Sequence, residues 1–105
     1  MAKFVLAYKG GQMAATEEES KKAMALWMSW FGGLGSAVSD IGNPFGAGTA
    51  VLSDGSRADI TAGVTGYSIV TAESLEAAAG LAKGCPVLDG GGSVEIYEAV
   101  EIAGM

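Results

Sequence analysis

The sequence predicts an α+β fold of the ferredoxin-like type, in which the elements follow the order β-α-β-β-α-β with an extra hairpin between the second and third main strands. Its length of 105 residues suits one domain, residues 1–105, built on one core. Four apolar segments are typical of strands in length and residue type, and two longer segments have the period of helices. These observations together predict a two-layer domain of helices against a sheet.

The first half of the chain supplies a strand and a long helix. In residues 3–9 both alternating sets of side chains are apolar, which predicts a central strand buried on both faces. Thr16 and Glu19 then stand in capping-box spacing and predict the start of a helix. Glycines from Gly32 onward are expected to end this helix. Residues 36–42 predict the second strand.

The second half repeats the pattern after a hairpin. Residues 49–61 contain Asp54-Gly55 between two apolar-polar segments, which is typical of a hairpin tip. Residues 66–72 predict the third main strand, and the alanine-rich residues 73–83 predict a helix that lies close to the sheet. Residues 93–102 predict the last strand. We expect a bulge or a sheet edge at Glu98, because its charge interrupts the apolar face.

Composition excludes several classes of function. The net charge is −6 and no basic cluster occurs, so we expect no nucleic-acid partner. No run approaches the roughly 18 apolar residues that a membrane span needs, and the N-terminal apolar run is too short for a signal peptide, which favours a cytoplasmic protein. Half of the residues are nevertheless hydrophobic. We therefore expect a homodimer in which a second copy covers an apolar face.

The only cysteine, Cys85, lies close to the triple glycine of residues 90–92. The chain contains no histidine to activate a thiol, and the expected position just after a helix, with Gly84 as a left-handed cap, disfavours a thiolate. The glycines precede a strand rather than a helix, so they predict a turn and no phosphate loop. With one cysteine and no histidine the usual ligands of transition metals are missing, which leaves only a carboxylate site for a hard cation open. We predict no metal site and no cofactor.

Residues 27–46 (WMSWFGGLGSAVSDIGNPFG) and residues 66–98 (GYSIVTAESLEAAAGLAKGCPVLDGGGSVEIYE) resemble the YCII-related (YciI-like) proteins, which are small dimeric α+β barrels. The resemblance implies a sheet-to-sheet homodimer. Some relatives are enzymes of small ring compounds, for which a histidine on the first helix with a nearby aspartate is the proposed site. This chain has Ala25, Trp27 and Met28 in the matching stretch, and only Asp54-Gly55 remains of the Asp-Gly-Pro-Phe motif of a related subgroup. A histidine-dependent activity therefore does not transfer.

Topology predicts where a site could lie. If the first and third main strands run parallel, the end of the first helix, the end of the second strand and the start of the third meet at one edge of the sheet. Trp30, Asp40 and Tyr67 would meet there, and the loop of residues 43–65 would bring Arg57 within reach. The candidate catalytic residues are thus Asp40 and Tyr67, and the candidate ligand-binding residues are Trp27, Trp30 and Arg57.

Plainer interpretations exist for the same residues. Tryptophans at helical spacing are often core or interface anchors, and an aspartate before Gly-Asn-Pro is often a turn residue. Two functions stay open. One is the binding of a small aromatic or anionic molecule in a cleft between the first helix and the sheet. The alternative is a cofactor-free lyase, isomerase or oxygenase of a small ring compound, in which Asp40 or Tyr67 transfers a proton.

Overall fold

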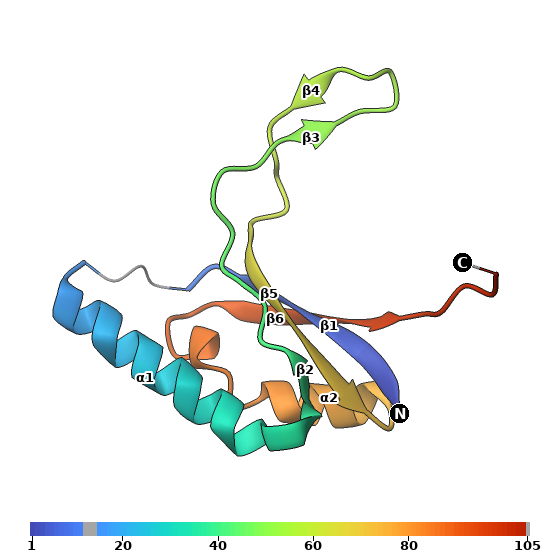
Figure 1. Ribbon diagram of the computed structural model, residues 1–105. Helices are drawn as coiled ribbons and strands as arrows, with labels where there is room; N and C mark the ends of the chain where they lie inside the picture. Colours follow the sequence, from blue (N-terminus) through green and yellow to red (C-terminus); the bar gives the residue numbers. More distant parts are fainter. Residues whose placement is uncertain (12–14, 105) are drawn as a thin grey trace.

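The structure, a computed structural model, describes residues 1–11 and 15–104. Two helices lie against one face of a four-stranded sheet, and a two-stranded arm rises on the other side (Figure 1). The predicted fold class is confirmed. The elements are β1 (Ala2–Lys9), α1 (Glu17–Leu34), β2 (Val38–Asp40), β3 (Ala50–Val51), β4 (Arg57–Ala58), β5 (Val64–Ala72), α2 (Leu75–Ala82) and β6 (Ser93–Ala99).

The sheet has the strand order β2-β5-β1-β6 and is antiparallel throughout. β1 is central, as predicted. The expectation that the first and third main strands run parallel is wrong, because β1 and β5 pair antiparallel with Val5 opposite Ile69. Helix α1 returns the chain so that β2 runs in the direction of β1, and β5 must then run back between them. Because α1 ends just before β2 begins, the end of α1 and the end of β2 lie at opposite ends of that strand and not side by side.

Helix α1 begins as predicted and ends later than predicted. The Thr16 hydroxyl accepts a hydrogen bond from the backbone N–H of Glu19 at 3.1 Å, and the Glu19 carboxylate accepts one from the N–H of Ala15 at 2.8 Å. The helix passes through Gly32 and ends at Gly35, whose φ of 57° lies in the left-handed region. A glycine inside a helix costs only about 1 kcal/mol, whereas a left-handed residue ends it.

Two strands are shorter than predicted. A 3₁₀ turn at Gly35–Ala37 occupies the start of the expected second strand, so β2 has only three residues. β6 ends at Ala99, and the pairing of β1 with β6 continues past Glu98 without a register shift. Glu98 therefore lies on an edge strand, which confirms one of the two alternatives that the sequence predicted. The other alternative, a bulge at Glu98, is not present.

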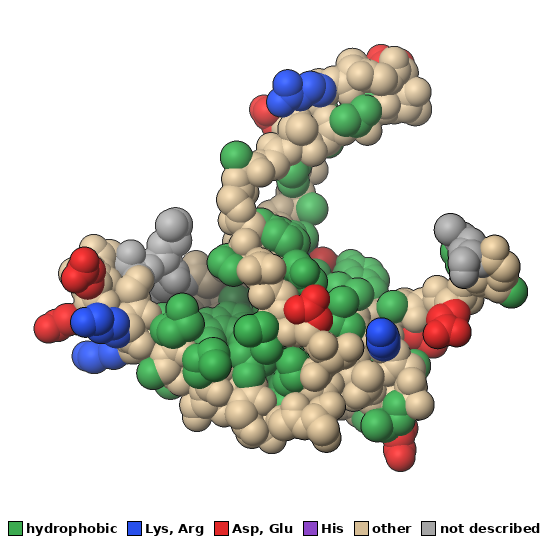
Figure 2. All heavy atoms as spheres, viewed as in Figure 1, with side chains coloured by type: hydrophobic (Ala, Val, Ile, Leu, Met, Phe, Trp, Pro, Cys, Tyr) green, Lys and Arg blue, Asp and Glu red, His purple; other side chains and the backbone are tan. Residues whose placement is uncertain are grey.

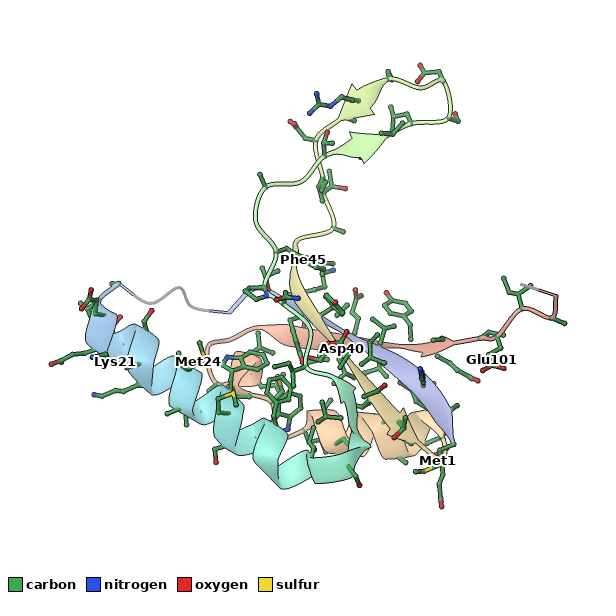
Figure 3. All side chains as sticks on the ribbon, viewed as in Figure 1. Met1, Lys21, Met24, Asp40, Phe45 and Glu101 are labelled. Atoms are coloured by element: carbon green, nitrogen blue, oxygen red, sulfur yellow. The ribbon has the colours of Figure 1, made fainter. Side chains whose placement is uncertain are left out.

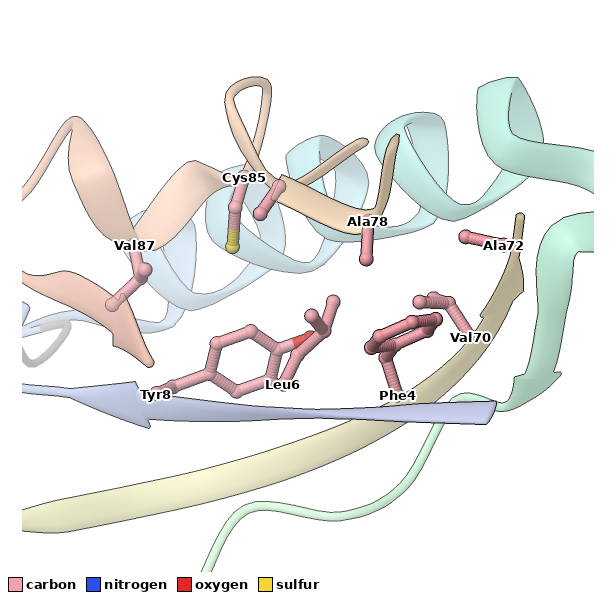
Figure 4. Close-up of a cluster of buried hydrophobic side chains, with 9 residues drawn as sticks. Phe4, Leu6, Tyr8, Val70, Ala72, Ala78, Cys85 and Val87 are labelled. Carbon is pink, nitrogen blue, oxygen red and sulfur yellow. The ribbon is translucent and has the colours of Figure 1, made fainter. Parts of the chain in front are cut away.

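The core lies between the sheet and the helices (Figure 4). β1 contributes Phe4, Leu6 and Tyr8, each at most 5% exposed. The small side chains of Ala78 and Ala82 let α2 approach the sheet closely. In contrast, α1 has no buried residue and reaches the core only through partly buried side chains such as Trp27 and Trp30.

The other face of the sheet has no cover within the described chain. Val5, Ala7 and Ile69 point away from the helices, because neighbours along a strand alternate between the two faces. These side chains are only partly buried. The prediction that the first strand is buried on both faces therefore does not hold for a single chain. We call this surface the open face.

A short hydrogen-bond chain crosses the core. The Tyr8 hydroxyl donates to the Ser68 hydroxyl at 2.6 Å, and Ser68 donates to the carbonyl of Ile41 at 2.6 Å. Ser68 is fully buried, so its hydroxyl satisfies two polar groups at once. The chain ties β1 and β5 to the segment that follows β2.

We expect Ser68→Ala to lower the free energy of unfolding by about 2–3 kcal/mol and Tyr8→Phe by about 1 kcal/mol. The first change leaves the Tyr8 hydroxyl and the Ile41 carbonyl without their partner, whereas the second leaves the Ser68–Ile41 bond intact. Urea unfolding of both variants beside the unchanged protein measures the difference. An equal or reversed order of the two losses would contradict the role assigned to Ser68.

Candidate functional site

The arm, residues 45–64, leaves the sheet between β2 and β5 (Figure 1). Its base is held by backbone hydrogen bonds from Phe45 N–H to the Thr65 carbonyl at 2.8 Å and from Tyr67 N–H to the Asn43 carbonyl at 3.3 Å. The turn before it requires a glycine at residue 42, which has a φ of 72° and no room for a Cβ against the Tyr67 carbonyl. The base of the arm is therefore fixed to the sheet.

Three side chains meet at this base. The Tyr67 hydroxyl donates to Oδ2 of Asp40 at 3.5 Å, while Oδ1 of Asp40 accepts the N–H of Gly42 at 2.8 Å. The ring of Phe45 stacks on Tyr67 with centroids 5.7 Å apart. Phe45 and Asp40 both lie near the point where the arm joins the sheet (Figure 3). Asp40 is thus a turn residue and also the partner of the Tyr67 phenol.

A solvent-open hollow of about 500 Å³ lies beside this cluster. Its apolar walls come from Phe45, Ile60 and Val64, and it contains the carboxylate of Asp59. Pockets for small ligands commonly fall in the range of roughly 300–1,000 Å³ and combine apolar walls with few polar groups. The hollow has the size of such a site, although its lining is as polar as it is apolar and one side is open.

Arg57 lies farther along the arm, on β4. Its Nε donates to the Thr49 hydroxyl at 3.4 Å, and it lines a smaller hollow of about 260 Å³ together with Asp59. Asp59 thus lines both hollows. Arg57 is on the side of the sheet that carries Asp40 and Tyr67, as part of the arm rather than of their cluster.

The two tryptophans lie on the helical side. Trp27 meets Tyr8 edge to face at 4.8 Å between centroids, and Trp30 is 6.5 Å from the same ring. The indole N–H of Trp30 donates to the Leu81 carbonyl at 3.2 Å. Gly84 does not have the expected left-handed conformation; a Cβ there would lie 3.3 Å from the Trp30 ring, so its role is close approach. Trp30 therefore joins α1 to the end of α2.

The expected meeting of Trp30, Asp40 and Tyr67 does not occur. Ser68 faces the helices, because it bonds to Tyr8, and Tyr67 precedes it on the strand and faces the opposite side. The structure brings Asp40 and Tyr67 together and leaves Trp27 and Trp30 on the other face. A single cleft between the first helix and the sheet does not contain all five predicted residues.

Sequence reasoning missed Phe45 as a site residue. The signal available was an aromatic residue directly after the Asn-Pro turn, at the start of the long loop. Its stacking on Tyr67 depends on the pairing of Pro44 with Gly66, which brings the two ends of the loop together. Nothing in the local sequence reveals that pairing.

Cys85 is a core residue. It is 2% exposed, and burial raises the pKa of its thiol to about 11. A thiol in this setting is a poor nucleophile. Within residues 1–11 and 15–104, no three side chains of His, Cys, Asp or Glu gather where they could hold a metal ion. In the same part of the chain, no helix has the length and apolar character that crossing a membrane requires.

The fold is similar to that of 5-chloro-2-hydroxyhydroquinone dehydrochlorinase from Burkholderia phenoliruptrix AC1100, solved in complex with 2,5-dihydroxybenzoquinone. The two chains share 16% identity over 93% of each, with a TM-score of 0.57. At this identity the similarity shows the fold alone. No family model and no curated protein sequence matches the chain, so membership in the YciI-like family stays a prediction.

The buried thiol and phenol predict a loss of stability at alkaline pH. Burial raises the pKa of Cys85 from 9.0 to about 11 and that of Tyr8 from 10.0 to about 12. The unfolded chain then loses these protons first, so the free energy of unfolding should fall from pH 9 upward, by on the order of 2 kcal/mol for each group.

Urea unfolding across this pH range measures the effect. Cys85→Ala should remove the part of the fall between pH 9 and about 11, and Tyr8→Phe the part between pH 10 and about 12. The variants and the unchanged protein are compared at each pH, so that contributions common to all three cancel. Parallel curves for all three proteins would show that neither group contributes.

Proposed function

We propose that the protein binds a small, flat aromatic or anionic molecule, without a cofactor, in the hollow at the base of the arm. The observation that carries this proposal is the Phe45–Tyr67 stack, which lies beside a hollow of mixed polar and apolar lining and is backed by the Asp40 carboxylate. Ring faces favour offset stacking on other rings, and a hydroxyl or carbonyl of the ligand can pair with the polar groups nearby.

The charges around the hollow bear on the class of ligand. The carboxyl oxygens of Asp40 and Asp59 accept hydrogen bonds, so they favour a ring whose hydroxyl groups donate hydrogen bonds. Arg57 is the cation on the arm that can pair with an anionic group. A hydroxylated ring with a carbonyl or acidic substituent uses both features. The ring compound named in the complex of the structurally similar dehydrochlorinase belongs to this class.

A second candidate function is a cofactor-free lyase, isomerase or oxygenase of such a ring compound. The observation that favours it is the hydrogen bond from the Tyr67 phenol to Asp40. A carboxylate can take a proton from the ligand, and a phenol held beside it can supply one in return. Enzymes of small ring compounds within the YciI-like family, which the sequence resembles, support the same class.

The tryptophan cluster is the other surface on which a ring could stack, in the cleft predicted between the first helix and the sheet. Trp27 is only partly buried, whereas Trp30 is held by its bond to Leu81. If the cluster binds the ligand, Trp27 is the side chain able to contact it. We keep it as the comparison site in the binding experiment.

We also propose a sheet-to-sheet homodimer. The open face presents Val5, Ala7 and Ile69, which a solvated sheet face would replace by polar residues. A second copy of the chain covers these residues in the arrangement that the YciI-like resemblance implies. The cytoplasmic location and the lack of nucleic-acid partners stay predictions from the sequence.

We expect Phe45→Leu to weaken the binding of hydroxylated quinones, phenols and aromatic acids by roughly tenfold, because the stacking ring is lost while the apolar wall remains. Isothermal titration calorimetry over a panel of these compounds measures the change. Trp27→Leu is the matched control and should bind as the unchanged protein does. The opposite result, loss in Trp27→Leu alone, would move the site to the helical side.

Asp40→Asn separates binding from catalysis. The amide oxygen can still accept the N–H of Gly42, so the turn is kept, but the base is removed. If the protein is an enzyme, the turnover of a bound ring compound should fall by roughly 100-fold or more while its affinity changes only slightly. A pure binding protein should change in affinity alone. Thermal unfolding checks that the fold is intact, and undiminished turnover would exclude Asp40 as the base.

A further inference from the structure

The arm is an amphipathic ribbon. β3 and β4 pair with Ala50 opposite Ala58 and Val51 opposite Arg57. Because side chains alternate along each strand, one face of the ribbon is apolar apart from Ser56, and the other is polar apart from Val51. A Cβ placed on Gly48 would lie 2.7 Å from the Ile60 side chain. Residues 48 and 60 therefore face the same side of the ribbon, as this assignment requires. The apolar face carries Ala50, Leu52, Ala58 and Ile60, and the polar face carries Thr49, Arg57 and Asp59.

The apolar face of the arm has no cover from residues 1–11 or 15–104 of its own chain. Leu52 is 49% exposed and Ile60 is 52% exposed. An isolated two-stranded hairpin is at best marginally stable in water and gains stability by packing an apolar face against another surface. The exposed apolar face of the arm is therefore typical of a hairpin that packs against another molecule.

The arm adjoins a second uncovered apolar surface, the open face. Phe45 at the base of the arm stacks on Tyr67, which belongs to that face. Hydrophobic side chains continue from the body to the base of the arm and along part of it (Figure 2). The arm also rises on the side of the sheet that the helices leave free (Figure 1). One partner that covers the open face thus also lies against the arm.

The chain exposes more surface than a compact monomer does, and the excess is large enough for an interface with a partner. The chain exposes 7,374 Å², whereas a compact monomer of its mass exposes about 5,400 Å². Its radius of gyration is 15.3 Å, against about 13 Å for a compact domain of this length. The excess of roughly 2,000 Å² exceeds the ~800 Å² that each partner contributes to a standard interface.

We propose that the arm of each chain clasps a second copy of the same chain, with Leu52 packed on the partner. The inference rests on the proposed sheet-to-sheet homodimer. Packed sheets lie about 10 Å apart, and the segment from Phe45 to Asp54 spans roughly 30 Å when extended, so the arm reaches beyond the partner's sheet. A two-fold axis makes the contact reciprocal, and one partner then covers both apolar surfaces of each chain.

The neighbouring residues Val51 and Leu52 provide a matched test, because they lie on opposite faces of the ribbon. Leu52→Asp should raise the dissociation constant of the dimer by at least roughly 30-fold, since a charge replaces an apolar side chain at the interface. Val51→Asp introduces the same charge opposite Arg57 and should change the dissociation constant by less than about threefold. Sedimentation across a dilution series measures both, and circular dichroism confirms that the body of each variant is folded.

Thiol protection gives an independent readout, because Cys85 is buried and should react slowly in the folded chain. Leu52→Cys should react slowly with a thiol reagent in the dimer and fast after dilution to the monomer. Val51→Cys should react fast at both concentrations. The unchanged protein supplies the background rate from Cys85.

The outcomes separate the two proposals. An unchanged protein that sediments as a monomer at micromolar concentration overturns the homodimer and the clasp together. A stable dimer that Leu52→Asp and Val51→Asp leave equally intact, with both introduced thiols fast in the dimer, overturns the clasp alone. Dimer weakening and thiol protection confined to position 52 are the results expected of the clasp.

Discussion

The structure depends on the burial of only one face of its sheet. Phe4, Leu6 and Tyr8 of the central strand lie under the helices, and the residues between them face the other way. This alternation decides on which side every later residue acts. It directs Ser68 into the core and Tyr67 out of it, and so places the tryptophans and the Asp40–Tyr67 pair on opposite faces.

The sequence predicted the elements better than their faces. The capping box at Thr16 and the Asp54-Gly55 turn are local signals, and both predicted features are present. In β1 both alternating sets are apolar, so periodicity could not show which set faces the helices. That choice depends on pairing with distant strands, and an error of one residue moves a side chain to the other face. The expected meeting of Trp30 with Asp40 and Tyr67 is wrong for this reason.

Two glycines in the site also have long-range contacts that the local sequence could not reveal. Gly84 looked like a helix cap, but its small size serves the Trp30 indole, which comes from a helix more than fifty residues earlier. Gly42 stands at the end of the predicted second strand, and its close approach to the Tyr67 carbonyl fixes the base of the arm. Asp40 was predicted as a site residue or a turn residue, and the structure gives it contacts of both kinds. Long-range approach of this kind has no local pattern in the sequence.

The hollow and the open face lie on the same side of the sheet, and this joins the two proposals. A partner on the open face lies against the arm whose base forms the walls of the hollow. Any ligand that binds the dimer more tightly than the monomer must strengthen the dimer by the same factor, because the two equilibria form a closed cycle. The one-sided core therefore places the hollow and the open face, on which the two proposals rest, on one side of the sheet.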